Sequence, residues 1–180
     1  MTLVAFDLNG TLLDPGDEGP ALQRAVRLAM AHTLASDFRP FAELLEAAGG
    51  SVPEAMDPFS DVVEGLDRLA EAGHRLIVIT NSARETGTQH LERAGLLARF
   101  ERVVGVDEVG AYKPDRRVYA YALDQVGAQA GDSWLVAAHD WDIVGARAAG
   151  MRTLFVDRGG PPLTTVAAEQ TVAALTEARI

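Results

Sequence analysis

An aspartate stands directly after a short apolar run near the start of the chain. The run spans residues 3–6, and Asp7 follows it, with Asn9, Gly10 and Thr11 close behind. A carboxylate at the end of a buried strand would lie over a crevice, partly desolvated and oriented by turn N–H groups. Aspartate in that setting can act as a nucleophile. Because Asp, Asn and Gly are also common in ordinary turns, this segment alone leaves both interpretations open.

A second set of polar residues follows two later apolar runs. Thr80 and Asn81 come after the run at 76–79, where they could bind an anion at a helix start or simply cap that helix. Lys113 comes after the run at 103–106 and is the only lysine in the chain, against fifteen arginines. This usage favours a compact point charge with a role that a guanidinium could not fill, over a lone surface lysine.

A fourth run, at 134–138, leads into His139 and Asp142. Asp142 could be only a helix cap, and His139 could be structural. However, the carboxyl ends of parallel strands meet at one edge of a sheet, so both are expected near Asp7. Lys113 would then keep Asp7 ionised by opposite-charge attraction, and Asp142 could fix Lys113. Polar groups after four strands therefore predict a site at that edge.

Short apolar runs alternate with segments of helical periodicity along most of the chain. This alternation predicts an α/β fold with a doubly wound, mostly parallel sheet of about five strands. One helix is expected to begin at Asp57-Pro58 and to end at Gly73, and a second is expected at 118–126. The expected strands are 3–6, 76–79, 103–106, 134–138 and 153–156.

One interval lacks a strand. Two helical stripes, at 22–34 and 41–48, are flanked on both sides by segments containing Pro and Gly. Because the interval opens after the first strand, we expect a small helical cap (15–56) above the site. The α/β core would then comprise residues 1–14 and 57–180. An ordinary pair of packing helices is the alternative.

Composition limits the partners. The chain has 180 residues, enough for one domain with a core. Its formal net charge of -10 argues against nucleic acid or an anionic membrane as the main partner, and is compatible with a small anionic substrate bound locally. The absence of cysteine excludes disulfides and a cysteine nucleophile. No basic leader and no apolar run of roughly 20 residues is found, so we expect a cytoplasmic protein, with its oligomeric state open.

The order and spacing of these residues resemble the haloacid dehalogenase superfamily along nearly the whole chain. The segment Asp7 to Thr11 is similar to its first motif, Thr80-Asn81 to the second, Lys113-Pro114 to the third, and Ala138 to Asp142 to the fourth. This resemblance implies a Rossmann-like core, a mobile cap and a covalent aspartyl intermediate formed by Asp7.

Two departures bear on the branch of the superfamily. Its magnesium-dependent phosphatases carry a second Asp, the general acid, where this chain has Asn9, and a metal-ligating Asp where it has Ala138. The chain resembles more closely the 2-haloacid dehalogenase branch, which needs no metal and whose halide leaves unprotonated. In that branch the residues matching Lys113, Tyr119 and Asp142 belong to the active site.

The resemblance to dehalogenases implies a two-step hydrolysis without a required cofactor. Asp7 would attack the halogen-bearing carbon in line, and water activated near Asp142 would hydrolyse the ester to a 2-hydroxy acid. The residues expected to position the substrate or the nucleophile are Asn9, Thr11, Thr80, Asn81, Tyr119 and His139.

The resemblance is incomplete where the substrate would bind. The dehalogenases place an aromatic residue at position 9, Ser at Ala137 and Asn at His139. Their longer cap also supplies an arginine that receives the halide. Arg24, Arg27 and Arg39 are candidate substitutes, none of them in a matching motif.

Two alternatives remain open. A magnesium-dependent phosphatase of small phosphorylated metabolites would hold its metal with Asp7, the backbone of Asn9, and Asp142. A catalytically silent binding protein of the same fold would be stabilised by a ligand without forming a product.

Overall fold

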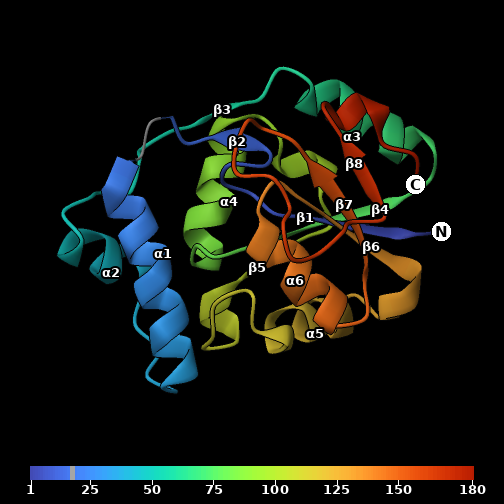
Figure 1. Cartoon of the computed structure of the whole chain (residues 1–180). Coiled ribbons are helices and arrows are strands. Elements are labelled where there is room, and N and C mark those ends of the chain that lie inside the picture. The colour runs from blue at the N-terminus through green and yellow to red at the C-terminus, as the bar shows by residue number, and fades with distance from the viewer. Residues whose placement is uncertain (17–18) are drawn as a thin grey trace.

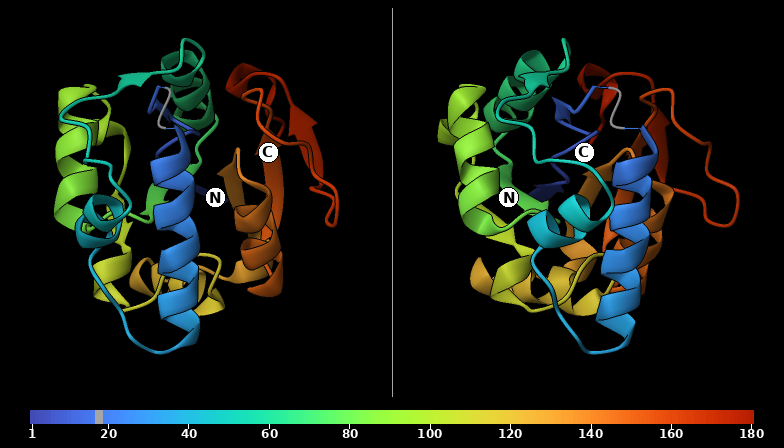
Figure 2. Two further views of the ribbon diagram at one scale, coloured as in Figure 1. Left: turned by 60° about the vertical axis from the view of Figure 1, so that its left-hand side comes forward. Right: turned by 90° about the vertical axis from the view of Figure 1, so that its left-hand side faces the viewer.

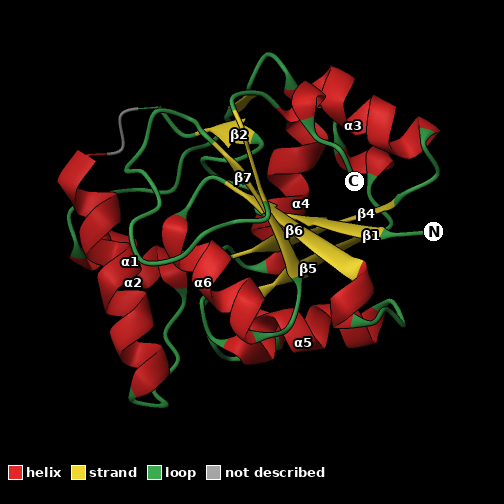
Figure 3. Cartoon of the chain, turned by 45° about the vertical axis from the view of Figure 1, so that its right-hand side comes forward, coloured by secondary structure: helices red, strands yellow, loops and turns green. Residues whose placement is uncertain are grey.

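The computed structural model describes residues 1–16 and 19–180 and contains a six-stranded parallel sheet between helices (Figure 1, Figure 3). The strands are β1 (Leu3–Phe6), β4 (Arg75–Thr80), β5 (Arg102–Gly105), β6 (Ser133–Ala137), β7 (Arg152–Val156) and β8 (Gln170–Val172). Their order is β5-β4-β1-β6-β7-β8, so β1 is central and lies between β4 and β6. The strand order reverses around β1, which is where ligands bind in open α/β sheets.

Helices cover both faces of the sheet. The α-helices are α1 (Gly19–Leu34), α2 (Phe41–Ala47), α3 (Val62–Glu71), α4 (Arg84–Arg93), α5 (Arg116–Gln125) and α6 (Asp140–Ala148), and 3₁₀ turns occur at Leu97–Arg99, Val106–Glu108, Ala130–Asp132 and Leu175–Glu177. Successive strand residues point to opposite faces. Ala5 and Leu135 therefore pack with α5 and α6, whereas Val4 and Val136 pack with α3 and α4. Figure 1 shows these two pairs of helices on opposite sides of the sheet.

Helices α1 and α2 lie together at one end of the molecule, and both chain termini lie at the other (Figure 1, Figure 2). The chain leaves the core through β2 (Leu13–Asp14) and returns through β3 (Asp57–Pro58), which pair with each other in antiparallel orientation. Tyr112 joins the core to this helical pair. Its ring stacks on Phe38 with 5.1 Å between centroids, and its hydroxyl donates to the carbonyl of Arg39.

The predicted α/β fold with a parallel sheet is confirmed. The bounds of four of the five predicted strands shift by one residue at one or both ends, and three further details differ. The sheet has a sixth strand, β8, which was missed because it is a three-residue edge strand without an apolar run. The helix expected from Asp57-Pro58 begins instead at Val62, since both residues form β3, where proline is tolerated at a sheet edge. Leu34, expected on an apolar stripe, is 88% exposed. Among the helices in the described ranges, none is long and apolar enough to cross a bilayer.

Candidate active site

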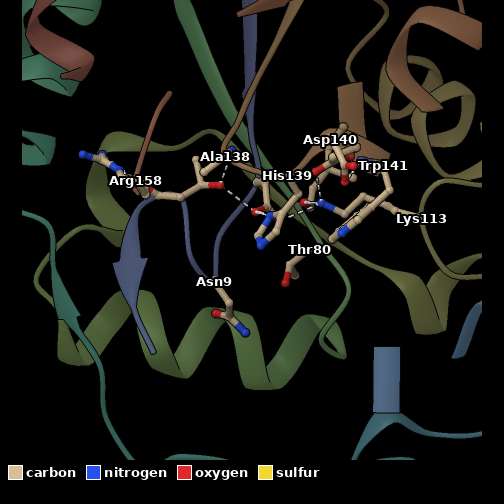
Figure 4. A network of polar contacts seen from close by, with 12 residues as sticks. Asn9, Thr80, Lys113, Ala138, His139, Asp140, Trp141 and Arg158 are labelled. Atoms are coloured by element: carbon tan, nitrogen blue, oxygen red, sulfur yellow. Dashed lines mark hydrogen bonds and ion pairs between the residues drawn. The ribbon is translucent and has the colours of Figure 1, made fainter. Parts of the chain in front are cut away.

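Asp7 directly follows the central strand, and polar groups from neighbouring elements surround its carboxylate. Figure 4 shows Lys113, Ala138 and His139 of this network of polar contacts. Its Oδ1 accepts a hydrogen bond from Nζ of Lys113 at 2.7 Å. Its Oδ2 accepts one from the hydroxyl of Thr11 at 2.7 Å, and Nδ1 of His139 lies 3.1 Å from the same oxygen. The backbone N–H of Ala138 donates to the Thr11 hydroxyl, which links the two segments. Both oxygens of Asp7 are thus fixed by donors.

Lys113 is fully buried and spends its three donors on three oxygens. Besides Asp7, its Nζ contacts Oδ2 of Asp142 at 2.7 Å and the carbonyl of Ile79 at 2.9 Å. The backbone N–H of Lys113 donates to Oδ1 of Asn81 at 2.9 Å. Asn81 therefore holds the lysine in place and leaves its Nδ2 as the donor that it can offer a ligand.

Asp142 is fully buried on the far side of Lys113. Its Oδ1 accepts a hydrogen bond from the hydroxyl of Tyr119, so each of its carboxylate oxygens has a donor. Gly145 makes this approach possible, because a Cβ there would lie only 2.5 Å from the Tyr119 hydroxyl oxygen. Asp142 occupies the first turn of α6, yet its side chain serves the site rather than the helix end.

The charges perturb one another strongly. Burial raises the pKa of Asp7, but Lys113 and His139 outweigh it and hold that pKa well below its usual value. Burial lowers the pKa of Lys113, and the two carboxylates more than reverse this effect. The pKa of Asp142 is raised, because burial and repulsion by Asp7 exceed the attraction of Lys113. The pKa of His139 is raised by Asp7 despite burial. Asp7 is therefore anionic at neutral pH.

A cavity of about 290 Å³ adjoins Asp7. It is also lined by four of the residues predicted to bind substrate, namely Asn9, Thr80, Asn81 and His139. Thr11 and Tyr119, predicted in the same group, lie outside the lining and are almost completely buried. Their hydroxyls hold the carboxylates of Asp7 and Asp142 instead.

Two residues without a predicted role shape the position of His139. Its ring stacks on Trp141, with 4.8 Å between ring centroids. Gly10 has a positive φ of 80°, and a Cβ there would lie 3.0 Å from Cε1 of His139. Glycine at this turn therefore lets the imidazole reach Asp7. In the sequence, only the place of Gly10 in the first motif indicates a role for this glycine.

The candidate arginines do not reach the site. Arg24 and Arg27 are exposed on α1, and neither lines the cavity. Arg39 is 54% exposed and pairs with Asp37. None of the three candidate substitutes for a halide-binding arginine therefore lines the cavity.

The donor set does not fit magnesium. Of the ligands considered for a phosphatase, Asp7 and Asp142 share the ammonium of Lys113, and their remaining contacts are to Thr11, His139 and Tyr119. Ala138 offers no carboxylate. Asp140 is exposed, and its Oδ1 accepts from the backbone N–H of Trp141. Within the described ranges, no three His, Asp or Glu side chains are grouped so as to hold a metal ion.

Comparison with known sequences identifies two kinds of relative. The chain is 34% identical over 103 residues to an (S)-2-haloacid dehalogenase of Pseudomonas sp. (strain YL), covering 57% of this chain and 44% of that protein. It is 30% identical over 203 residues to a phosphoglycolate phosphatase of Caulobacter vibrioides, covering 92% and 84%. The chain spans about half the length of the curated dehalogenases that it matches.

Solved structures share the fold. A dehalogenase crystallised with an intermediate complex has a TM-score of 0.88 at 23% identity, covering 98% of this chain and 95% of that one. The L-2-haloacid dehalogenase from Xanthobacter autotrophicus with chloropropionic acid covalently bound has a TM-score of 0.84 at 20% identity, covering 98% and 96%. Residues 19–156 match the family model described as haloacid dehalogenase-like hydrolase. This chain therefore belongs to the haloacid dehalogenase-like hydrolase family, with dehalogenases among its similar relatives.

Proposed function

We propose that the chain hydrolyses the carbon–halogen bond of 2-haloacids through a covalent ester on Asp7. The proposal rests on one observation: an ionised Asp7, paired with Lys113 at 2.7 Å, faces a cavity that has Asn9 where a general acid would stand. An amide cannot protonate a leaving group and recover its proton as a carboxylic acid does. A halide leaves as an anion and needs no such proton.

The reaction has two steps. A carboxylate oxygen of Asp7 attacks the halogen-bearing carbon from the side opposite the halogen; the new C–O bond forms as the C–halogen bond breaks, and the halide leaves with the electron pair. Water then attacks the carboxyl carbon of the ester, and the bond from that carbon to the substrate oxygen breaks. One proton of the water goes to the departing alkoxide to give the 2-hydroxy acid, the other is released to solvent, and the carboxylate of Asp7 is restored. The water reaches Asp7 from the cavity, past His139, because Asp142 is enclosed by Lys113 and Tyr119.

The neutral donors at the strand ends suit the polar head of such a substrate. Asn9, Thr80, Asn81 and Ser82 all line the cavity beside Asp7. Their amide and hydroxyl groups can bind a carboxylate oxygen without protonating the nucleophile. Thr11 and Tyr119 lie outside the cavity lining, and their hydroxyls orient the carboxylates of Asp7 and Asp142.

The test is halide release from 2-bromopropionate in the presence of a chelator. We expect multiple turnovers in the wild-type protein and none in Asp7→Ala. In oxygen-18 water, repeated turnover should place the heavy isotope in the peptide that contains Asp7. Absence of the heavy isotope from this peptide after many turnovers would instead indicate direct attack by water and contradict the ester mechanism.

A phosphatase of small phosphorylated metabolites is the second candidate. One observation favours it: the match to a phosphoglycolate phosphatase extends over 92% of the chain, against 57% for the dehalogenase. It requires phosphate release that magnesium stimulates and a chelator abolishes. If a ligand raises the unfolding temperature while neither halide nor phosphate is released, the chain is a binding protein of this fold.

A further inference from the structure

The cavity beside Asp7 has two chemically different ends. Asn9, Thr80 and Asn81 line it beside the nucleophile at the strand ends, and Thr86, His90 and Asp107 add polar groups from α4 and the 3₁₀ turn after β5. The side chains that the helical pair contributes to the lining are apolar. The side chains of this apolar wall are Leu22, Val26, Phe38, Phe41 and Leu45, together with Tyr112 of the core.

The apolar wall is held in place by Tyr112. This side chain is 1% exposed, and its ring lies 5.1 Å from that of Phe38 and 6.1 Å from that of Phe41. Its backbone N–H donates to the hydroxyl of Thr33 on α1 at 2.9 Å, and its hydroxyl donates to the carbonyl of Arg39. The helical pair is thus bonded twice, near the end of α1 and just before α2, to the residue that immediately precedes Lys113. A wall fixed in this way needs little reordering when a ligand binds.

No lysine or arginine lines the cavity in the part of the chain that the structure describes. Its acidic side chains and imidazoles are those of Asp7, Asp107, His90 and His139. A guanidinium clamp for the substrate is therefore missing. Recognition has to come from neutral donors at the polar end and from apolar contact along the remaining length.

The volume of the cavity also bears on the ligand. A space of about 290 Å³ has room for on the order of ten heavy atoms, if each takes about the volume of a water molecule. A haloacetate or a 2-halopropionate has only about half that number of heavy atoms and would leave much of this space unfilled. The apolar wall would then face water, although burying it is what favours binding.

We infer that the substrate carries an extended apolar group on its halogen-bearing carbon, as in 2-bromohexanoate, and that the apolar wall selects for it. The carboxylate and the halogen lie at the polar end, and the hydrocarbon chain lies along Leu22, Val26 and Phe41. For the carboxylate and the halogen, this inference rests on the proposed function. For the hydrocarbon chain, it rests on the cavity alone.

The experiment has a turnover arm and a binding arm. In the first, kcat/KM for halide release is measured from 2-bromopropionate to 2-bromohexanoate. We expect about fourfold per methylene, or roughly 60-fold over the three methylenes of the series, from the transfer free energy of each buried group. In the second, calorimetry measures the Kd of propanoate and hexanoate for the Asp7→Asn protein, which cannot turn over; a similar ratio is expected.

Two variants of one helix provide the matched comparison. Leu22→Ala removes part of the apolar wall and should lower the ratio of kcat/KM for 2-bromohexanoate to kcat/KM for 2-bromopropionate by about tenfold. Leu28→Ala makes the same truncation on α1 at a half-buried residue outside the cavity lining. It should leave the ratio between the two substrates unchanged.

The two arms separate the two claims. If kcat/KM for halide release stays constant or falls with chain length, and the Kd does not change with chain length, the inference of an apolar substrate chain is wrong and the dehalogenase proposal is unaffected. Binding that rises with length while no haloacid is turned over supports the apolar ligand and removes the dehalogenase. Equal effects of Leu22→Ala and Leu28→Ala on the substrate ratio would also overturn the assigned wall.

Discussion

Replacing Lys113 by methionine removes the one cation held between two buried carboxylates. The ammonium is fully buried and lies 2.7 Å from an oxygen of Asp7 and 2.7 Å from an oxygen of Asp142. Methionine has a similar length and no charge, so Asp142 loses its counter-ion and Asp7 keeps only His139. Removing one partner of a buried ion pair typically lowers the free energy of unfolding by about 3–5 kcal/mol.

The loss should depend on pH. In the wild-type protein the folded pKa of Asp7 lies below its usual 3.8, so its stabilising contribution is present above that pH and is lost as pH falls through the folded pKa. In Lys113→Met, burial and the mutual repulsion of Asp7 and Asp142 remain and raise both pKa values. A carboxyl with a raised pKa destabilises the folded state above that pKa, and acidification relieves the penalty. The deficit of the variant is therefore largest at pH 8 and smaller at pH 5.

Urea unfolding followed by circular dichroism measures this deficit. With an m value of about 2 kcal/mol/M, a loss of about 4 kcal/mol lowers the midpoint by about 2 M at pH 8. Arg117→Met is the matched control, because it breaks an exposed ion pair with Asp115 and should change stability by less than about 1 kcal/mol. A deficit of Lys113→Met no larger than that of this control at pH 8, or one equal at pH 5 and pH 8, would refute the reasoning.

Two further substitutions test the groups around this cation. Tyr119→Phe removes the donor to Oδ1 of buried Asp142 and should lower the unfolding free energy by about 1–3 kcal/mol. The control is Tyr121→Phe on the same helix, whose hydroxyl makes a long 3.4 Å contact; it should change the unfolding free energy by less than about 0.5 kcal/mol. Equal losses in the two variants would contradict the role of Tyr119. His139→Asn should lower the unfolding free energy by no more than about 1 kcal/mol. The whole of this loss should be seen below pH 6.5, and it should shrink as pH rises through the pKa of His139, which Asp7 raises. A loss that grows with pH in urea unfolding would show that this pair does not form.

The central strands could be predicted because burial on both faces leaves a continuous apolar run. The expected strand at 3–6 is β1 as observed, and the one at 76–79 is one residue shorter at each end than β4. β8 follows no such rule: Gln170 is half-buried and Thr171 is exposed, so the strand is visible only through its pairing with β7. Edge strands of this length carry little local signal.

Chain topology also explains why the site could be located in advance, and side-chain direction explains what could not. Asp7 and Thr80 end neighbouring strands, so parallel pairing alone brings them together. Whether a hydroxyl faces the cavity or the core is decided by packing. Thr11 and Tyr119 turn to the core side, and the latter is possible only because Gly145 has no side chain. A single sequence contains no local pattern for such clearances.

The antiparallel pairing of β2 with β3 has a consequence for how this chain can change. Leu13 lies opposite Pro58 and Asp14 opposite Asp57. The two connections between the core and the helical pair are therefore paired with each other at a single junction. Since that junction already brings the two ends together, a segment of another length could be grafted between them for little additional loop-closure entropy. Ligand preference could then diverge by exchanging the inserted helices, while the carboxylates and the ammonium beneath remain where they are.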